Sequence, residues 1–411
     1  MQDGLRIDGE RLCRRIAELG QVGAIAGGGV ARLALTDEDR AGRDLVVGWM
    51  REMGLAVTVD ALGNVVGVRR GREDLAPVMM GSHIDTVRTG GRYDGNLGVL
   101  GGLEVLATLD DAGIVTRRPL AVAFFTNEEG SRFQPDMMGS LAFVGELPLE
   151  KALATAGIDG ATVGAELARI GYAGPAPVGG KKGKVHAYVE LHVEQGPVLE
   201  AEGFTIGAVE GVQGISWSEF TLTGQSNHAG TTPMRLRHDA GLVAARITTF
   251  ARQVATEMGG HQVATVGLLT QFPNLVNVVA NRVVMTVDLR NTDETLLKEA
   301  ERRVFAFAEG AAKEEGVGLS RRTLARFEPV AFDAALVGRV EAIARELGHE
   351  VRRLPSGAGH DAQILASVCP ACMVFVPSAK GVSHNVEEYT SPSDIQAGGD
   401  VLLRLVRELA G

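Results

Sequence analysis

The sequence predicts an α/β catalytic domain, with a mixed, mostly parallel sheet flanked by helices, interrupted by a smaller α+β domain. Three observations favour this class. Short apolar strands alternate with helices in the first half of the chain, and the same alternation returns after about residue 330. Between these parts the order changes to four strands with two long helices. At 411 residues, the chain is also long for one core, so two domains are expected.

The elements of the first part follow from apolar spacing and capping signals. In the second helix, Thr36 can cap the amino end, Asp39 stands three residues later, and Gly54 ends the helix. The predicted strands are short and almost continuously apolar, as is typical of buried parallel strands. The predicted helices are 10–20, 37–53 and 97–111, and the predicted strands are 57–60, 64–69, 77–82, 120–126 and 186–194.

Residues 213–327 show the other pattern, which is typical of an antiparallel four-stranded sheet with two helices. We therefore expect a catalytic domain made of residues 1–212 and 328–411, with 213–327 inserted in it. The predicted strands of the insertion are 217–223, 263–270, 277–290 and 320–327, and its helices are 238–257 and 294–315.

Composition excludes several classes of partner. The 41 basic and 51 acidic residues give a net charge of −10, with no strongly basic block, which disfavours nucleic acid and anionic membranes. No apolar run reaches the roughly 18 residues that a membrane helix needs. The three cysteines give no disulfide framework, and the charged N-terminus shows no secretory signal, so a cytoplasmic location is expected.

Metal-binding residue types stand at the ends of apolar runs, where open α/β sheets place their sites. Each alone has an ordinary explanation in a turn or on a surface. Together they supply three imidazoles, a carboxylate able to bridge and a pair of carboxylates, which is the inventory of a two-metal hydrolase. They are His83, Asp94, Glu128, Glu129, His192 and His384.

Neighbouring residues refine this hypothesis. His83 and Asp85 are two apart at a strand end, so they can face the same side, and Asp85 can accept the other ring N–H of His83, directly or through a near neighbour. Asp94 lies in a Gly-rich turn that suits a short bridging carboxylate. Because Glu128 and Glu129 are adjacent, they point differently, so one can bind metal while the other acts as a base.

The pair Cys369-Pro-Ala-Cys372 has the spacing of redox or zinc motifs. No second pair accompanies it, and it leads into the apolar run MVFVP. We therefore interpret these cysteines as packed thiols at the entrance of a strand.

Five segments resemble the M20 metallopeptidase clan, and more closely its amidase, hydantoinase and carbamoylase branch. They occur in the family's order, and the resemblance covers nearly the whole chain. It implies two divalent ions per subunit, a small-molecule substrate and an inserted lid domain that forms a homodimer, through strand 277–290 or helix 238–257. The segments are GSHIDTVRTGGRYDGNLGV, TNEEGSRFQPDMMGS, ELHVEQGPVLE, GQSNHAGTTPM and SGAGHDA.

The resemblance also implies roles at the metal centre. One ion is held by His83 and His192, the other by Glu129 and His384, and Asp94 bridges them. It makes Glu128 the general base and Asp85 the residue that orients His83, and Glu388 matches a supporting position. The form HVEQGP around His192 is that of the amidase branch, since peptidase relatives often have a carboxylate there.

For the substrate, the resemblance implies that His228, from the partner subunit, stabilises the oxyanion. A guanidinium at Arg290 can bind an α-carboxylate bidentately. Ala280-Asn281 stands where the family often has Pro-Gly, so the resemblance does not determine the conformation of this turn. The further substrate-binding candidates are Gln195, Asn277, Gly357, Gly359 and His360.

The resulting expectation is an N-carbamoyl-L-amino acid amidohydrolase that releases amino acid, ammonia and carbon dioxide, with Mn, Co, Ni or Zn as its metal. The form QPDMMGS after the glutamate pair favours this activity within the branch. The alternatives are β-ureidopropionase or allantoate amidohydrolase, then a dipeptidase or aminoacylase, and last a metal-binding scaffold without catalysis.

Overall fold

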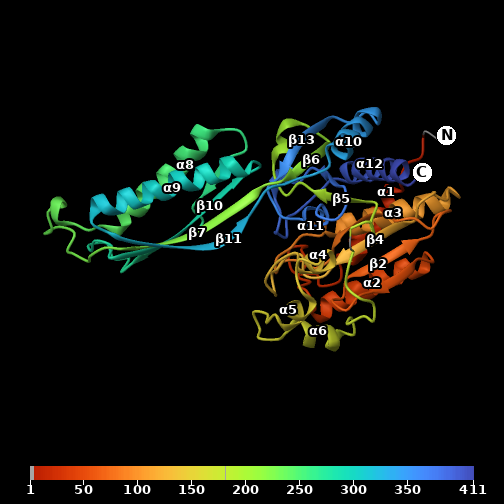
Figure 1. The fold of residues 1–411 in the computed structure, drawn as a ribbon, viewed down its shortest axis with the longest axis horizontal. Helices are drawn as coiled ribbons and strands as arrows, with labels where there is room; N and C mark the ends of the chain where they lie inside the picture. The colour runs from red at the N-terminus through yellow and green to blue at the C-terminus, as the bar shows by residue number, and fades with distance from the viewer. Residues whose placement is uncertain (1–3, 181) are drawn as a thin grey trace. The chain divides into compact units, whose positions relative to one another are not determined.

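The computed structural model describes residues 4–180 and 182–411. The chain forms two compact units, which are labelled by their elements in Figure 1. Unit 1 contains the residues up to Glu210 together with Phe332–Gly411, and unit 2 is the inserted segment Gly211–Ala331. Unit 1 is thus built from both ends of the chain.

Within the described residues, a nine-stranded sheet runs in the order β1-β2-β4-β3-β5-β14-β6-β12, and β13 also pairs with β6. The central pairs β4–β3, β3–β5 and β5–β14 are parallel, whereas β1–β2, β2–β4, β14–β6 and β6–β12 are antiparallel. This confirms the predicted mixed sheet, in which the four central strands run parallel. The strands are β1 (Ala56–Val59), β2 (Val65–Arg69), β3 (Val78–His83), β4 (Leu120–Phe125), β5 (Ala187–Val193), β6 (Ile206–Val212), β12 (Val330–Ala331), β13 (Val351–Ser356) and β14 (Ala371–Val376).

Every residue of the four central parallel strands is buried, which explains their almost continuous apolar sequences. Helices α1, α3 and α12 pack against one another, and α3 and α12 also pack on these strands. Helices α4 and α11 form a second group that contacts the strands. The helices of unit 1 are α1 (Gly9–Leu19), α2 (Asp37–Glu52), α3 (Asn96–Asp111), α4 (Met138–Val144), α5 (Leu149–Ala154), α6 (Val163–Ile170), α7 (Val198–Glu202), α10 (Ala334–Glu346), α11 (Asp361–Leu365) and α12 (Pro392–Ala410).

Capping residues and apolar spacing predicted the positions of most of the longer helices and strands correctly. The Thr36 side chain accepts a hydrogen bond from the Asp39 N–H, as an amino-terminal cap should. Helices α4–α6 and strand β6 are not among the elements predicted from the sequence. The helices α4–α6 have only six to eight residues each, so they present too few turns to give a clear period.

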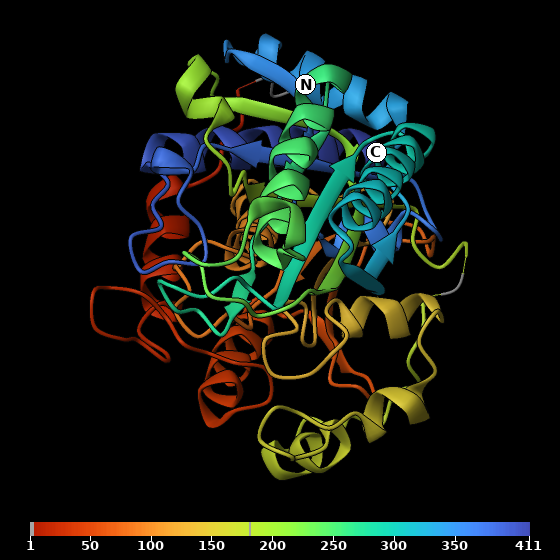
Figure 2. The ribbon, with the colours of Figure 1, turned by 90° about the vertical axis from the view of Figure 1, so that its left-hand side faces the viewer.

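Unit 2 has an antiparallel sheet in the order β11-β7-β10-β8, with β9 also on β10. Helices α8 and α9 lie side by side on one face of this sheet, with an apolar core between (Figures 1 and 2). The elements are β7 (Gly214–Thr223), α8 (Ala240–Met258), β8 (Val263–Thr265), β9 (Leu269–Phe272), β10 (Arg282–Asn291), α9 (Glu294–Glu315) and β11 (Gly318–Phe327).

Two predicted strands of unit 2 differ from the observed ones. The single strand 263–270 is broken into β8 and β9, which pair with different parts of β10. The strand expected from residue 277 begins only at Arg282, because Asn277 and Val279 pair through their main chains with the loop 227–229 instead. Apolar alternation continued through this loop and hid its start.

None of the helices in residues 4–180 and 182–411 combines the length and apolar character that crossing a bilayer requires.

Candidate metal centre and active site

The predicted ligands meet at one edge of the sheet in unit 1. The strands β4, β3, β5 and β14 are parallel neighbours, so their carboxyl ends lie together. His83 is the last residue of β3, and His192 is the last but one of β5. The glutamate pair follows β4, and His384 follows β14.

Asp94 lies at the centre of the cluster. Its Oδ1 is 3.2 Å from His192 Nε2 and 3.7 Å from His83 Nε2, and its Oδ2 is 3.2 Å from His384 Nε2. The ligand atoms of His83, Asp94 and His192 lie within 4.8 Å of one another, as do those of Asp94, Glu129 and His384. Asp94 belongs to both groups, which is the arrangement of a bridging carboxylate.

The two buried histidines are held in the form that a metal ligand needs. His83 Nδ1 is 2.9 Å from the main-chain oxygen of Asp85, and His192 Nδ1 is 2.9 Å from that of Val193. Each Nδ1–H donates to a carbonyl, so Nε2 is the ring nitrogen that faces Asp94 and is available to bind a metal. Imidazole nitrogens with carboxylate oxygens suit Mn, Co, Ni or Zn, so this donor set fits the predicted divalent ions.

Asp85 contacts His83, but through a different group from the one predicted. Its main-chain oxygen, not its carboxylate, accepts from His83, because Asp85 lies beyond the end of β3, where strand alternation no longer applies. The carboxylate accepts the N–H groups of Glu128 (3.2 Å) and Glu129 (3.3 Å). Asp85 thus fixes both His83 and the glutamate pair.

The turn that carries Asp94 is fixed from the other side. The Glu388 carboxylate accepts the N–H groups of Tyr93 (3.0 Å) and Asp94 (3.1 Å). Gly95 has φ +66°, and a Cβ there would lie 2.4 Å from the His83 ring. A residue with a side chain would therefore displace a ligand, so this position requires glycine.

Burial and charge set the protonation of the cluster. Burial raises the pKa of Glu129 to about 8 and that of Glu128 well above its usual range. Burial also opposes ionisation of Asp94, but hydrogen bonds with His192, His384 and His83 outweigh it and lower the Asp94 pKa well below its usual range. A central anion beside carboxyl groups that readily accept protons is typical of an acid–base site.

Two of the predicted substrate contacts in unit 1 border this cluster. The Gln195 amide donates to Asp94 Oδ2 at 2.8 Å, from a residue whose φ is +57°. The His360 ring is buried, and its centroid lies 4.6 Å from that of the His192 ring. Its Nε2 is 2.8 Å from the Ser356 hydroxyl. The glycine positions 357 and 359 form the bend between β13 and α11.

The predicted contacts of unit 2 fall into two places. His228 forms a bridge with Val278, and the Ala229 N–H donates to the Asn277 carbonyl at 2.9 Å, so His228 and Asn277 are together. Arg290 is near the far end of β10, where its guanidinium bonds Asp288 at 2.9 Å. The first place precedes β10, and at about 3.3 Å per residue Arg290 lies roughly 26 Å along β10 from Arg282.

Sequence reasoning missed Glu190, a fully buried carboxylate beside the cluster. It accepts from the Ser82 hydroxyl at 2.6 Å and from the Ala362 N–H at 2.8 Å. With His192 and His360 it forms a third group able to hold a metal ion. The signal was present, because Glu190 precedes His192 by two residues in β5 and so faces the same side.

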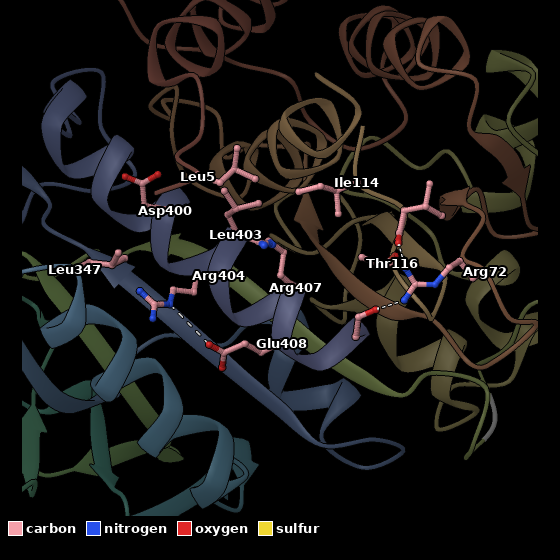
Figure 3. A pocket seen from close by; sticks show the side chains of 12 residues that line it. Leu5, Arg72, Ile114, Thr116, Leu347, Asp400, Leu403, Arg404, Arg407 and Glu408 are labelled. Atoms are coloured by element: carbon pink, nitrogen blue, oxygen red, sulfur yellow. Dashed lines mark hydrogen bonds and ion pairs between the residues drawn. The ribbon is translucent and has the colours of Figure 1, made fainter. Parts of the chain in front are cut away.

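A surface hollow and the two cysteines of the C-x-x-C pair lie outside the metal groups. The hollow, of about 400 Å³, is lined by residues of α12, the segments after β2 and before β4, the residue after α10 and both chain ends, and none of them belongs to the metal groups (Figure 3). Its labelled arginines are Arg72, Arg404 and Arg407. Cys369 and Cys372 are free and buried, and burial raises the pKa of Cys369 to about 12, so it stays a thiol.

Comparison with known proteins adds independent information. Residues 79–408 match Peptidase family M20/M25/M40. The chain is 44% identical over 406 residues to an N-carbamoyl-L-amino-acid amidohydrolase of Rhizobium meliloti, covering 98% of this chain and 97% of the relative. It is 42% identical to an N-carbamoyl-L-amino acid amidohydrolase of Geobacillus stearothermophilus, covering 98% and 99%.

The fold is also similar to that of a solved structure. An amidase of the hydantoinase/carbamoylase family from Burkholderia multivorans superposes with a TM-score of 0.97 at 47% identity, covering 99% of this chain and 98% of that chain. The similarity extends over both units and is not limited to the metal-binding segments.

Proposed function

Because the chain belongs to Peptidase family M20/M25/M40, we propose that it is a metal-dependent amidohydrolase that cleaves the ureido C–N bond of N-carbamoyl-L-amino acids. The products are the amino acid, ammonia and carbon dioxide. The observation that carries this proposal is that Asp94 belongs to two groups of ligands, while Glu128 lies beside His83 and belongs to neither group. The substrate class is supported by the relatives of 44% and 42% identity.

We assign one divalent ion to His83, His192 and Asp94, and a second to Asp94, Glu129 and His384. Such ions supply Lewis acidity, which lowers the pKa of water and polarises the carbonyl under attack. Asp85 and Glu388 hold the ligand-bearing turns in place through the main-chain hydrogen bonds described above. The ions are Mn, Co, Ni or Zn by the chemistry of the donors.

Glu128 is the general base in this proposal. Its carboxylate is buried beside His83, at 3.3 Å, and is not needed to complete either ligand group. It accepts the proton of the attacking water and then delivers that proton to the leaving nitrogen. Burial favours the protonated carboxyl, which suits the second of these steps.

The remaining roles concern the substrate. We assign the α-carboxylate to Arg290 and the developing oxyanion to His228. Gln195, Asn277 and His360 contact the ureido group, and main-chain groups of the glycine positions 357 and 359 border it. Gln195 and His360 are supported by their places beside Asp94 and His192.

We also propose that the protein is a cytoplasmic homodimer whose sites are completed by the partner subunit. His228 pairs with Val278, which precedes β10, and Arg290 lies roughly 26 Å along β10 from its first residue, whereas an N-carbamoyl amino acid is far shorter. One substrate therefore cannot contact both residues of the same chain, but it can contact one from each of two chains. Apolar side chains exposed on unit 2, among them Leu269, Leu275 and Val276, are available for such a contact.

Mixing two inactive variants tests the shared site. Glu128→Gln disables unit 1, and His228→Ala disables unit 2. If each site uses His228 of the partner, a mixed dimer has one intact site, and randomly exchanged dimers recover about a quarter of wild-type activity. No recovery, in a mixture whose subunit exchange is verified by mass spectrometry, would assign His228 to its own chain.

A substrate panel tests the reaction itself. Metal-loaded protein is incubated with N-carbamoyl-L-amino acids, N-carbamoyl-β-alanine, allantoate, dipeptides and N-acetyl amino acids, and ammonia and amino acid are both measured. We expect ammonia and amino acid in equal amounts from N-carbamoyl-L-amino acids. Release of amino acid from N-acetyl substrates alone, with no ammonia from carbamoyl ones, would instead support the aminoacylase reading.

A further inference from the structure

Arg32 is a fully buried arginine close to the metal centre that the proposed chemistry does not use. Its guanidinium makes four hydrogen bonds, and every acceptor is neutral. Nε donates to the Ile84 carbonyl at 2.7 Å, and Nη2 donates to the Asn96 side-chain oxygen at 2.8 Å. Nη1 donates to the carbonyls of Leu19 (3.0 Å) and Val22 (2.8 Å).

This arginine carries its charge without an ion pair among the described residues. The nearby negative charges that favour its ionised form belong to Asp39 and Asp85. The Asp39 carboxylate is bonded instead by Arg43 at 2.8 Å, and that of Asp85 by the Glu128 and Glu129 N–H groups. Burial lowers the Arg32 pKa to about 10, so the group is still a cation at neutral pH.

A buried charge without a paired charge disfavours folding, so its position calls for a compensating function. The acceptors indicate which function. Ile84 lies between the ligand His83 and Asp85, and Asn96 is two residues after Asp94. The main chains of Arg32 and Thr86 are also joined, because the Thr86 N–H donates to the Arg32 carbonyl at 2.9 Å.

We propose that Arg32 is a positioning residue of the metal centre, which fixes the His83–Thr86 turn and the Asp94–Asn96 turn relative to each other and thereby sets the metal affinity. The planar guanidinium presents donors in several fixed directions, so one group reaches both turns. A lysine ammonium at the same place is a single point with three donors and cannot reach all four acceptors. This inference rests on the metal centre proposed above, but not on the identity of the substrate.

The test measures metal binding to stripped protein, by competition with a chromophoric chelator, using Zn²⁺ and Mn²⁺. Arg32→Lys keeps the charge and loses the fork, and Asn96→Ala removes one acceptor while leaving Arg32 in place. We expect each to weaken binding of at least one equivalent of metal, by about 10- to 100-fold for Arg32→Lys. In the double variant the losses should be less than additive, because both changes break the same connection.

Arg43→Lys is the matched control. Arg43 is also fully buried, but it donates to Asp39, the Gly63 carbonyl and the Thr126 hydroxyl, none of which lies in either turn. We expect this variant to lower the apparent unfolding temperature of the metal-free protein while keeping wild-type metal affinity. That outcome separates general destabilisation from a specific effect on the ligands.

The proposal is overturned if Arg32→Lys folds cooperatively without metal and binds both ions within twofold of wild type. It is also overturned if Arg43→Lys loses as much affinity as Arg32→Lys. If the Arg32 variants do not fold, Asn96→Ala decides alone, and unchanged affinity rejects the proposal. A protein that shows the expected metal affinities but no turnover of N-carbamoyl substrates would reject the proposed reaction and retain the role of Arg32.

Discussion

The carboxylates of Glu128 and Glu129, although consecutive in the chain, face different histidines. Glu128 Oε2 is 3.3 Å from His83 Nε2, and Glu129 Oε2 is 3.4 Å from His384 Nε2. Both main-chain N–H groups are bonded by the same Asp85 carboxylate, so the divergence is fixed by the fold. This arrangement lets one carboxylate bind metal while its neighbour handles protons.

Glu128→Gln should keep the metal and lose turnover. The amide has nearly the same shape but cannot accept the proton of water, so we expect kcat to fall by about 10²- to 10⁴-fold. Metal content by atomic emission should stay at the wild-type value. In the matched variant Glu129→Gln, metal content itself should fall, and equal metal loss in both variants would contradict the division of roles.

Removal of metal should abolish activity and lower stability together. Ions that bind only the folded state stabilise it, by about 2.7 kcal/mol when the free ion is at 100 times its Kd. We expect chelation to lower the unfolding temperature and re-addition of Mn, Co, Ni or Zn to restore both properties. Full activity of protein shown to be metal-free would reject the metal centre.

Arg290→Ala should act on substrates that carry a carboxylate. Loss of a charge-assisted bidentate contact should lower kcat/KM by about 10- to 100-fold, mainly through KM. Arg282→Ala, at the other end of β10, is the control and should leave kcat/KM unchanged. If ureas without a carboxylate suffer equally from Arg290→Ala, the assigned contact is wrong.

Glu166 should contribute stability that disappears in acid. It forms ion pairs with Arg169 (2.9 Å) and Arg132 (2.7 Å), and the hydrogen bond with Arg169 is the main cause of its lowered pKa. A lowered folded pKa means that the stabilisation is present above the unfolded pKa, near 4.3, and is lost as the pH falls through the folded value.

Glu166→Gln should therefore lower the free energy of unfolding by about 1–2 kcal/mol at pH 6 to 7, where the wild-type carboxylate is ionised. Chemical denaturation at several pH values should show this difference shrinking as the pH falls from 5 toward 3. Glu10→Gln, at an exposed position, should show no such trend. A difference that grows in acid would contradict the assignment.

Much of the site was predictable because its ligands are placed by short-range rules. His83 and His192 end or nearly end buried strands, and the glutamate pair follows one, so strand order alone puts them at one edge. Asp85 could not be assigned in this way. Its carboxylate bonds residues more than 40 positions later in the chain, and no local pattern records that contact.

Unit 2 shows the same division. Its two helices and the succession of helices and strands along the chain followed from periodicity. The break between β8 and β9 and the late start of β10 depend on which segment each of them pairs with. The separation of His228 from Arg290 along β10 is likewise invisible in the sequence, where both belong to recognisable motifs.

The sequence by itself determined the fold class, the six metal-ligand candidates and their family. Such properties depend on hydrophobic period and on side-chain chemistry, which are local. Only the tertiary structure decided that Asp94 stands between two groups, that Asp85 and Glu388 hold the turns by main-chain contacts, and that Arg32 joins the segments of His83 and Asp94. These contacts join distant parts of the chain, and they exist only once the sheet has brought its carboxyl ends together.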